Sequence, residues 1–207
     1  MDTNRIICIG RQLGSGGSVV ARLLAQRFGC KLYDRELLNL AARESGFSEK
    51  FFEQNDEHKG FFRSLFHPMG RAFSTDGFYG QEFSEERLFQ IQSDVIRRAA
   101  EQGDCVFVGR CADYVLRDHP GMISIFVTAD LSERIGRVAT RRQCSHEEAR
   151  RFILKMESHR AAYYNYYTGK QWGHAAAYHL CVSTTPHGIE QTAELIADFI
   201  QPSSVNR

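Results

Sequence analysis

Several features that would place a protein in a broad functional class are missing from this sequence of 207 residues. No apolar run approaches the ~18 residues of a membrane-spanning helix, and the N-terminal residues MDTNRIICIG hold no apolar stretch of signal-peptide length. Lysine plus arginine (26) nearly balance aspartate plus glutamate (25), so the strong net charge typical of nucleic-acid or membrane binders is absent. We therefore expect a cytoplasmic protein that binds neither nucleic acid nor membranes.

The cysteines and histidines also lack the spacings of metal or redox sites. None of the six cysteines forms a C-x-x-C pair, and the eight histidines show no H-x-x-x-H spacing. Cys8, Cys105 and Cys181 lie in apolar runs with the composition of strands. We expect buried, reduced thiols, and no metal centre built from cysteine or histidine.

What the chain does contain is the alternation of strand and helix patterns that is typical of an α/β protein with a parallel sheet. The apolar run 5–9 is followed by the glycine-rich stretch 10–18, GRQLGSGGS, and then by a helical pattern that ends at Gly29. Ser145 and Glu148 form a capping-box pattern that starts the second of two helices between residues 131 and 160. Further strands are predicted at 30–33, 105–108, 123–127 and 180–182, and further helices at 35–45, 84–99 and 189–200.

The glycine-rich stretch has the composition of an anion-binding loop, because glycines between a strand and a helix turn backbone N–H groups toward the positive helix N-terminus. The Walker pattern G-x-x-x-x-G-K-[ST] is not met: its lysine position falls on Gly17, and only Gly16 and Ser18 match. The dinucleotide pattern G-x-G-x-x-G is also partial, with Val19 at its last position and Asp34 as the acidic residue. The loop alone leaves both nucleotide classes open.

The rest of the chain favours phosphoryl transfer over dinucleotide binding. About 70 residues separate Asp34 from the third predicted strand at 105–108, which is unexpected in a dinucleotide fold but suits an insertion that encloses a phosphoryl acceptor. An arginine-dense helical pair suits a lid that neutralises phosphates and excludes water. Its arginines are Arg134, Arg137, Arg141, Arg142, Arg150, Arg151 and Arg160.

With these features in hand, the sequence resembles the cytidylate kinase-like family of P-loop nucleoside monophosphate kinases. The resemblance runs from about residue 6 to 200 and rests on the loop and on YDRELLNLAARESG, NDE, VGRCADYVL, IFVTADLSERIGR and YYTGKQWG. The family loop reads S-R-x-x-G-S-G-G without the Walker lysine, and here Gly10 replaces its serine. Two further departures are Ser158-His159, where similar sequences have Asp-Lys, and His179, where they have Asp.

The resemblance implies a three-layer P-loop fold with a five-stranded parallel sheet of order 2-3-1-4-5. We expect one domain over residues 1–207, with a core at about 1–34, 84–130 and 178–202. An acceptor-binding helical insertion would occupy about 35–83, and an arginine-rich lid about 131–177. The implied ligands are ATP, Mg²⁺ and a small-molecule nucleotide acceptor, and a homodimer stays open.

The candidate site residues fall into three groups. Backbone N–H groups of the loop would bind the ATP phosphates, and the Ser18 hydroxyl would ligate Mg²⁺. Arginines would replace the missing lysine and neutralise the transferring group, whereas a third group would bind the acceptor. The loop residues are Gly14, Ser15, Gly16, Gly17, Ser18 and Val19; the catalytic arginines are Arg11, Arg110, Arg137, Arg141 and Arg142; the acceptor residues are Asp34, Gly109, Arg110, Asp113 and Arg160.

Each of these roles has a structural alternative that the sequence leaves open. Arg11 and Arg110 would also serve in ordinary ion pairs, Asp34 would cap a helix, and the lid arginines would be solvated charges. The tyrosines of YYNYYTGKQWG would either stack on a base or pack against the protein. The predicted function is transfer of the ATP γ-phosphoryl group to a nucleoside monophosphate, most readily CMP or dCMP. The alternatives are a kinase of a non-nucleotide acceptor, a nucleotide-binding regulatory protein without turnover, and, as the weakest, a dinucleotide-binding oxidoreductase.

Overall fold

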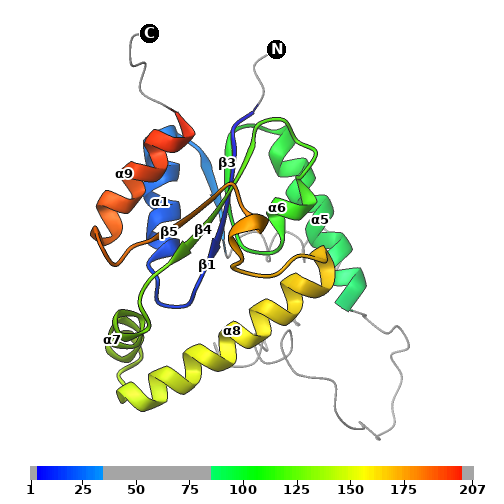
Figure 1. The fold of residues 1–207 in the computed structure, drawn as a ribbon. Coiled ribbons are helices and arrows are strands. Elements are labelled where there is room, and N and C mark those ends of the chain that lie inside the picture. Colours follow the sequence, from blue (N-terminus) through cyan, green and yellow to red (C-terminus); the bar gives the residue numbers. More distant parts are fainter. Residues whose placement is uncertain (1–3, 35–84, 202–207) are drawn as a thin grey trace, which may run out of the picture. The chain divides into compact units, whose positions relative to one another are not determined.

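The computed structural model describes residues 4–34 and 85–201 (Figure 1). Contacts divide the chain into one unit of residues 1–34 and 96–207 and a second unit of residues 35–95. The predicted helix 35–45 and the predicted insertion 35–83 lie outside the described residues. The strands are β1 (Ile6–Arg11), β2 (Lys31–Tyr33), β3 (Cys105–Val108), β4 (Met122–Thr128) and β5 (Leu180–Ser183), and the helices are α1 (Gly17–Phe28), α5 (Glu85–Glu101), α6 (Ala112–Val115), α7 (Leu131–Arg142), α8 (His146–Thr168) and α9 (Gly188–Ile200), with a 3₁₀ turn at Ala175–Ala177.

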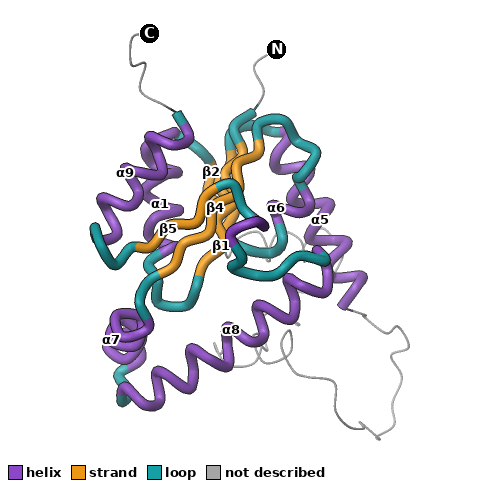
Figure 2. Tube along the Cα trace, viewed as in Figure 1, coloured by secondary structure: helices purple, strands orange, loops and turns teal. Residues whose placement is uncertain are grey.

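The five strands form one parallel sheet in the order β2-β3-β1-β4-β5, which confirms the predicted order (Figure 2). β1 lies at the centre, where Ile9 is aligned with Val108 of β3 and with Ile125 of β4. These central strands are nearly continuous apolar runs because both of their faces are covered. The carboxyl ends of all five strands therefore meet at one edge of the sheet, which is where α/β folds place their ligands.

One face of the sheet packs against α1 and α9 (Figure 1). The core there consists of side chains that alternate along the strands, including Ile7, Ile9, Val106, Ile125 and Val127, with Val20 and Leu24 of α1 and Ile196 of α9. Side chains at the intervening positions, such as Cys8 and Phe126, point to the opposite face, where α6 contacts β1 and β4. Successive side chains of a strand therefore point alternately to the α1 and α9 layer and to the α6 layer.

Helices α7 and α8 pack on each other around a small core of Val138, Ala139, Ala149 and Ile153. In Figure 1, α7 is seen nearly end-on while α8 runs across the view, so the two helix axes cross. The predicted capping box at the start of α8 is present, with Ser145 accepting from the Glu148 N–H and Glu148 accepting from the Ser145 N–H. α8 continues to Thr168, well past the predicted end near residue 160. Arg160 and the tyrosines at 163–167 therefore lie on one continuous helix.

Two predictions about local structure are corrected. Arg11 is the last residue of β1 and does not lie past the end of the strand, because Gly10 and Arg11 continue the pairing with Phe126 and Val127. Cys181 is exposed, because β5 lies at the edge of the sheet and is less buried than the central strands. The short helix α6 had no periodic pattern long enough to predict it.

Candidate active site

The phosphate loop (residues 10–18) is shaped by its own polar groups. The hydroxyl of Ser15 donates to the Gln12 carbonyl at 2.9 Å and accepts from the Gly17 N–H at 3.3 Å. The Ser15 N–H also donates to Gln12, and the Val19 N–H donates to the Gly16 carbonyl. Within the described residues, the N–H groups of Gly14, Gly16 and Ser18 make no hydrogen bond. The structure thus narrows the predicted set of phosphate donors to these three.

Gly17, at the position of the Walker lysine, is crowded by Arg11. A Cβ on Gly17 would lie 2.6 Å from the Arg11 Cβ and 3.3 Å from the Val127 Cβ, both closer than side chains ordinarily pack. A lysine at this position would therefore require Arg11 to move. The absent lysine and the arginine at the end of β1 are linked by this steric conflict.

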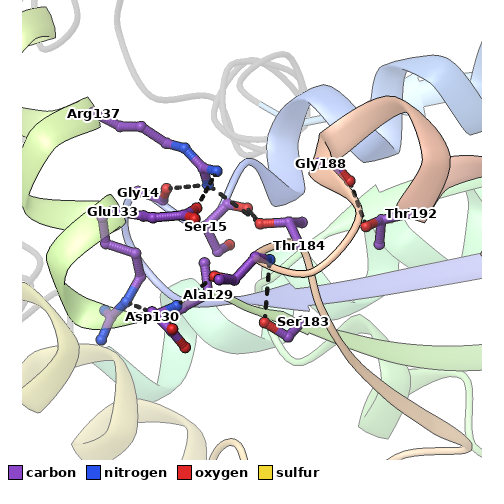
Figure 3. A network of polar contacts seen from close by, with 12 residues as sticks. Gly14, Ser15, Ala129, Asp130, Glu133, Arg137, Ser183, Thr184, Gly188 and Thr192 are labelled. Carbon is purple, nitrogen blue, oxygen red and sulfur yellow. Dashed lines mark hydrogen bonds and ion pairs between the residues drawn. The ribbon is translucent and has the colours of Figure 1, made fainter.

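Arg137 of α7 lies over the phosphate loop (Figure 3). Its Nη1 donates to the Gly14 carbonyl and to the Thr184 hydroxyl, each at 3.2 Å, and its Nη2 pairs with Glu133 at 2.6 Å. The hydroxyl of Thr184 in turn donates to the Ser15 carbonyl at 2.8 Å. An arginine of α7, itself paired with Glu133, is thus hydrogen-bonded to the loop through the Gly14 carbonyl.

A buried ion pair fixes the other side of the loop. Arg134 of α7 contacts Glu157 of α8 at 2.6 Å and donates from Nε to the Ala129 carbonyl at 2.9 Å. The same Glu157 oxygen accepts the Leu13 N–H of the loop at 3.0 Å. Both side chains are largely buried, with 7% and 14% of their surfaces exposed. The helical pair and the loop are therefore joined by direct polar contacts.

Three arginines from three separate elements gather beside the loop around Asp34. The Nη2 of Arg11 lies 3.7 Å from Oδ1 of Asp34, and the Arg11 guanidinium packs against Gly109. Arg160 of α8 donates to the Arg11 carbonyl at 3.1 Å. We call Arg11, Arg110, Arg160 and Asp34 the arginine cluster.

The cluster carries more positive charge than its own carboxylate balances. Burial and the nearby Arg160 lower the pKa of Arg11 to about 9. Burial also lowers the pKa values of Arg110 and Arg160. The positive charges of Arg110 and Arg141 lower the pKa of Arg160 further. Within the described residues, the Arg110 side chain makes neither an ion pair nor a hydrogen bond. Such crowded guanidinium groups favour a bound anion, which would relieve their repulsion.

The backbone around Arg110 is held in an uncommon conformation. Gly109, Arg110 and Cys111 have φ angles of 76°, 61° and 53°, in the left-handed region that non-glycine residues seldom adopt. Gly109 also makes room for the Arg11 guanidinium that packs against it. Backbone strain of this kind persists only where the surroundings fix it, and it often accompanies binding sites.

The structure does not bring all the predicted residues together. Asp113 is turned toward Tyr164, whose hydroxyl donates to its Oδ2 at 2.7 Å. Arg142 lies 3.9 Å from the centre of the Phe152 ring and packs within the helical pair, away from the loop. Ser18 and Val19 are exposed in the first turn of α1.

Sequence patterns did not single out Glu157 and Thr184, and they marked Tyr164 only as one tyrosine of the stretch YYNYYTGKQWG. Glu157 and Tyr164 lie on α8 at helical spacing from Arg160, and this spacing was the one available signal once the helix was known to continue. Thr184 follows the edge strand β5, and no motif marks it.

A parallel sheet of this order, with a glycine-rich loop between β1 and α1 and arginines at its carboxyl edge, defines a P-loop kinase fold. The chain belongs to the cytidylate kinase-like family, whose profile matches residues 6–186. It is thus a member of a family of kinase-type phosphotransferases, as the sequence predicted.

Individual relatives agree with this assignment. A cytidylate kinase of Methanopyrus kandleri (strain AV19) is 27% identical over 209 residues, covering 95% of this chain and 93% of that protein. The crystal structure of an uncharacterized protein from Eubacterium ventriosum ATCC 27560 has a TM-score of 0.73 at 27% identity, covering 97% of this chain and 100% of the other. Shikimate kinase from Bacteroides thetaiotaomicron has a TM-score of 0.55 at 12% identity, covering 95% and 98% of the two chains, which shows a shared fold alone.

The described part of the chain contains neither a metal-binding group of side chains nor a membrane-spanning helix. Within residues 4–34 and 85–201, no three side chains of histidine, cysteine, aspartate or glutamate are grouped so that they could hold a metal ion. No helix in the same ranges combines the length and the apolar character needed to cross a bilayer.

Proposed function

We propose that the protein transfers the γ-phosphoryl group of ATP to the phosphate of a nucleoside monophosphate, with CMP or dCMP as the preferred acceptor. The observation that carries the proposal is the arginine cluster, in which Arg11, Arg110 and Arg160 face one carboxylate beside the phosphate loop. An anion between these guanidinium groups would sit next to the nucleotide that the loop holds. The family and the M. kandleri cytidylate kinase support a nucleotide acceptor.

On the donor side, the N–H groups of Gly14, Gly16 and Ser18 would bind the phosphates of ATP at the N-terminus of α1. Arg137, already seated on the loop, would add the charge that the Walker lysine supplies elsewhere. The exposed Ser18 hydroxyl fits Mg²⁺, and in the absence of a grouped set of described carboxylates the remaining ligands would be phosphate oxygens and water. Bound there, Mg²⁺ would neutralise charge on the transferring group.

Phosphoryl transfer between phosphates depends on positioning the reactants and neutralising their charge, and it does not require a general base. An acceptor phosphate is already ionised at neutral pH, and the transferring group passes through a loose transition state with charge on its outer oxygens. Arg11, Arg110 and Arg160 would hold the acceptor in line, and Arg137 would stabilise the charge that develops toward the loop.

The direct test is ADP production with a panel of acceptors: CMP, dCMP, UMP, AMP, GMP and shikimate, each with ATP and Mg²⁺. The proposal expects turnover with CMP or dCMP that exceeds turnover with the other acceptors at least tenfold. Turnover restricted to a non-nucleotide acceptor would refute the nucleotide assignment while leaving the kinase reaction intact.

A binding measurement distinguishes a protein that binds nucleotide without turnover from one that does not bind nucleotide at all. Because a ligand that binds only the folded state stabilises it, ATP with Mg²⁺ should raise the melting temperature. A shift without any ADP production would indicate a nucleotide-binding regulatory protein. The absence of a shift with every nucleotide would contradict the assignment of the loop.

A further inference from the structure

One face of α8 contacts three different parts of the candidate active site. Glu157, Arg160 and Tyr164 are three and four residues apart, so they lie on the same side of the helix. Glu157 accepts the Leu13 N–H of the phosphate loop, and Arg160 donates to the Arg11 carbonyl at the end of β1. Tyr164, one turn further on, reaches the start of α6.

The contact at Tyr164 is short and buried. Its hydroxyl lies 2.7 Å from Oδ2 of Asp113, and 5% of the residue is exposed. Burial and the neighbouring Asp113 raise the pKa of Tyr164, so the hydroxyl stays protonated and donates to the carboxyl group. The Tyr164 ring also stacks on Tyr178 at 5.9 Å. Removing this hydroxyl would take away the side-chain donor of the half-buried Asp113 carboxyl group and leave its backbone donors at Asp113 and Tyr114.

The hydrogen bond joins the two segments that supply the outer arginines of the cluster. Asp113 lies in the first turn of α6, three residues after Arg110 of the strained turn, and Arg160 precedes Tyr164 by one helical turn. Burial, and then the charge of Arg110, lowers the pKa of Arg160, so the two guanidinium groups lie close enough to repel each other. Without the hydrogen bond between Tyr164 of α8 and Asp113 of α6, this repulsion would move the two guanidinium groups apart.

We propose that Tyr164 and Asp113 are positioning residues that hold Arg160 beside Arg110, so that the two guanidinium groups bind one acceptor phosphate. This inference rests on the proposed function for the identity of the anion. It assigns Asp113 a role through Tyr164 in place of the predicted direct contact with the acceptor. Tyr164 is thus not a catalytic residue: it acts on the acceptor through Arg160.

The test compares Tyr164→Phe with Tyr166→Phe, a matched control on the same helix whose residue is 70% exposed. The probe is inorganic phosphate, titrated into protein saturated with a non-hydrolysable ATP analogue and Mg²⁺ so that the phosphate loop is already occupied. We expect Tyr164→Phe to weaken phosphate binding about fivefold to tenfold. Affinity for the ATP analogue should change less than twofold, and Tyr166→Phe should leave both affinities unchanged.

A second comparison shows whether Tyr164 acts through Arg160. In an Arg160→Met background, Tyr164→Phe should have no further effect on phosphate binding, because the group that it positions is gone. Asp113→Asn, which keeps an acceptor oxygen, should bind phosphate more tightly than Asp113→Ala. The inference is overturned if Tyr164→Phe matches Tyr166→Phe, if both ligands weaken equally, or if the effects of the Tyr164 and Arg160 changes add.

The proposed function and this inference fail in different ways. If the wild-type protein produces no ADP with any acceptor of the panel, the nucleotide kinase assignment fails, but the phosphate titrations still decide the positioning role. If turnover with CMP is found and the titrations show no selective effect of Tyr164→Phe, the kinase assignment stands and the positioning role is refuted.

Discussion

Arg11 lies 3.7 Å from Asp34, and this contact directs the Arg11 guanidinium across Gly109 toward the end of β3. The sequence interpretation placed Arg11 in the phosphate loop as a substitute for the Walker lysine. In the structure its side chain begins beside the loop, at Gly17, and ends in the arginine cluster. The Arg11 guanidinium therefore belongs to the cluster that we propose binds the acceptor, whereas Arg137 donates a hydrogen bond to the Gly14 carbonyl of the loop.

Replacement of Arg11 by alanine is expected to lower turnover at least tenfold, because the transferring and acceptor phosphates lose a buried charge. The KM for the acceptor should rise more than the affinity for ATP falls. Steady-state kinetics with both substrates, together with ATP titration, measures the two effects. Near-normal turnover would refute a role for Arg11 in the reaction, and a loss confined to ATP binding would restore the lysine-substitute interpretation.

Anion binding by the unliganded cluster should depend on pH. The pKa of Arg11 is lowered to about 9, so the group is protonated at neutral pH and loses its charge as the pH rises through that value. The affinity for inorganic phosphate should therefore fall above about pH 9, well below the ordinary pKa of an arginine. The measurement is a phosphate titration at several pH values, repeated with Arg11→Met. The decrease should disappear in that variant, and an unchanged pH profile would contradict the assignment.

Restoring the Walker lysine is expected to damage the protein. A side chain on Gly17 meets the Cβ of Arg11, and overpacking of this kind costs about 1–3 kcal/mol. Gly17→Lys should lower the melting temperature and the affinity for ATP. The double variant Gly17→Lys with Arg11→Gly should recover much of the melting temperature, because glycine removes the Cβ that the new side chain meets. Thermal melts of the single and double variants test this, and a fully stable Gly17→Lys protein would show that no conflict exists.

Arg110 is expected to reduce stability in the absence of a ligand. Its pKa is lowered mainly by burial, so the folded state holds the guanidinium proton less tightly than the unfolded state does, and the charge opposes folding at neutral pH. Arg110→Met should therefore stabilise the ligand-free protein by about 1 kcal/mol, or roughly 2–4 °C, while raising the acceptor KM at least tenfold. Arg150→Met, at an exposed position of α8, is the control. A lower melting temperature for Arg110→Met would indicate that Arg110 has a structural role.

The fold was predictable because its signals are local. The apolar runs at residues 5–9 and 105–108 are short and bounded by glycine or charge, and the capping box at Ser145 marks the start of a helix within four residues of sequence. Such patterns indicate element type, and right-handed connections between parallel strands leave few arrangements of the sheet. The family resemblance then supplied the strand order that the patterns alone did not determine.

The sequence by itself also predicted anion binding, because a glycine-rich turn before a helix and a run of arginines are properties of composition and order. Only the tertiary structure decided which arginines meet. Arg11, Arg110 and Arg160 are far apart in the chain, and their approach depends on the register of β1 and β3 and on the length of α8. Arg142 belongs to the same arginine-dense segment yet packs on Phe152. The missing lysine has the same kind of explanation: the space at Gly17 is taken by the Arg11 side chain, and such a steric limit appears only when the chain is folded.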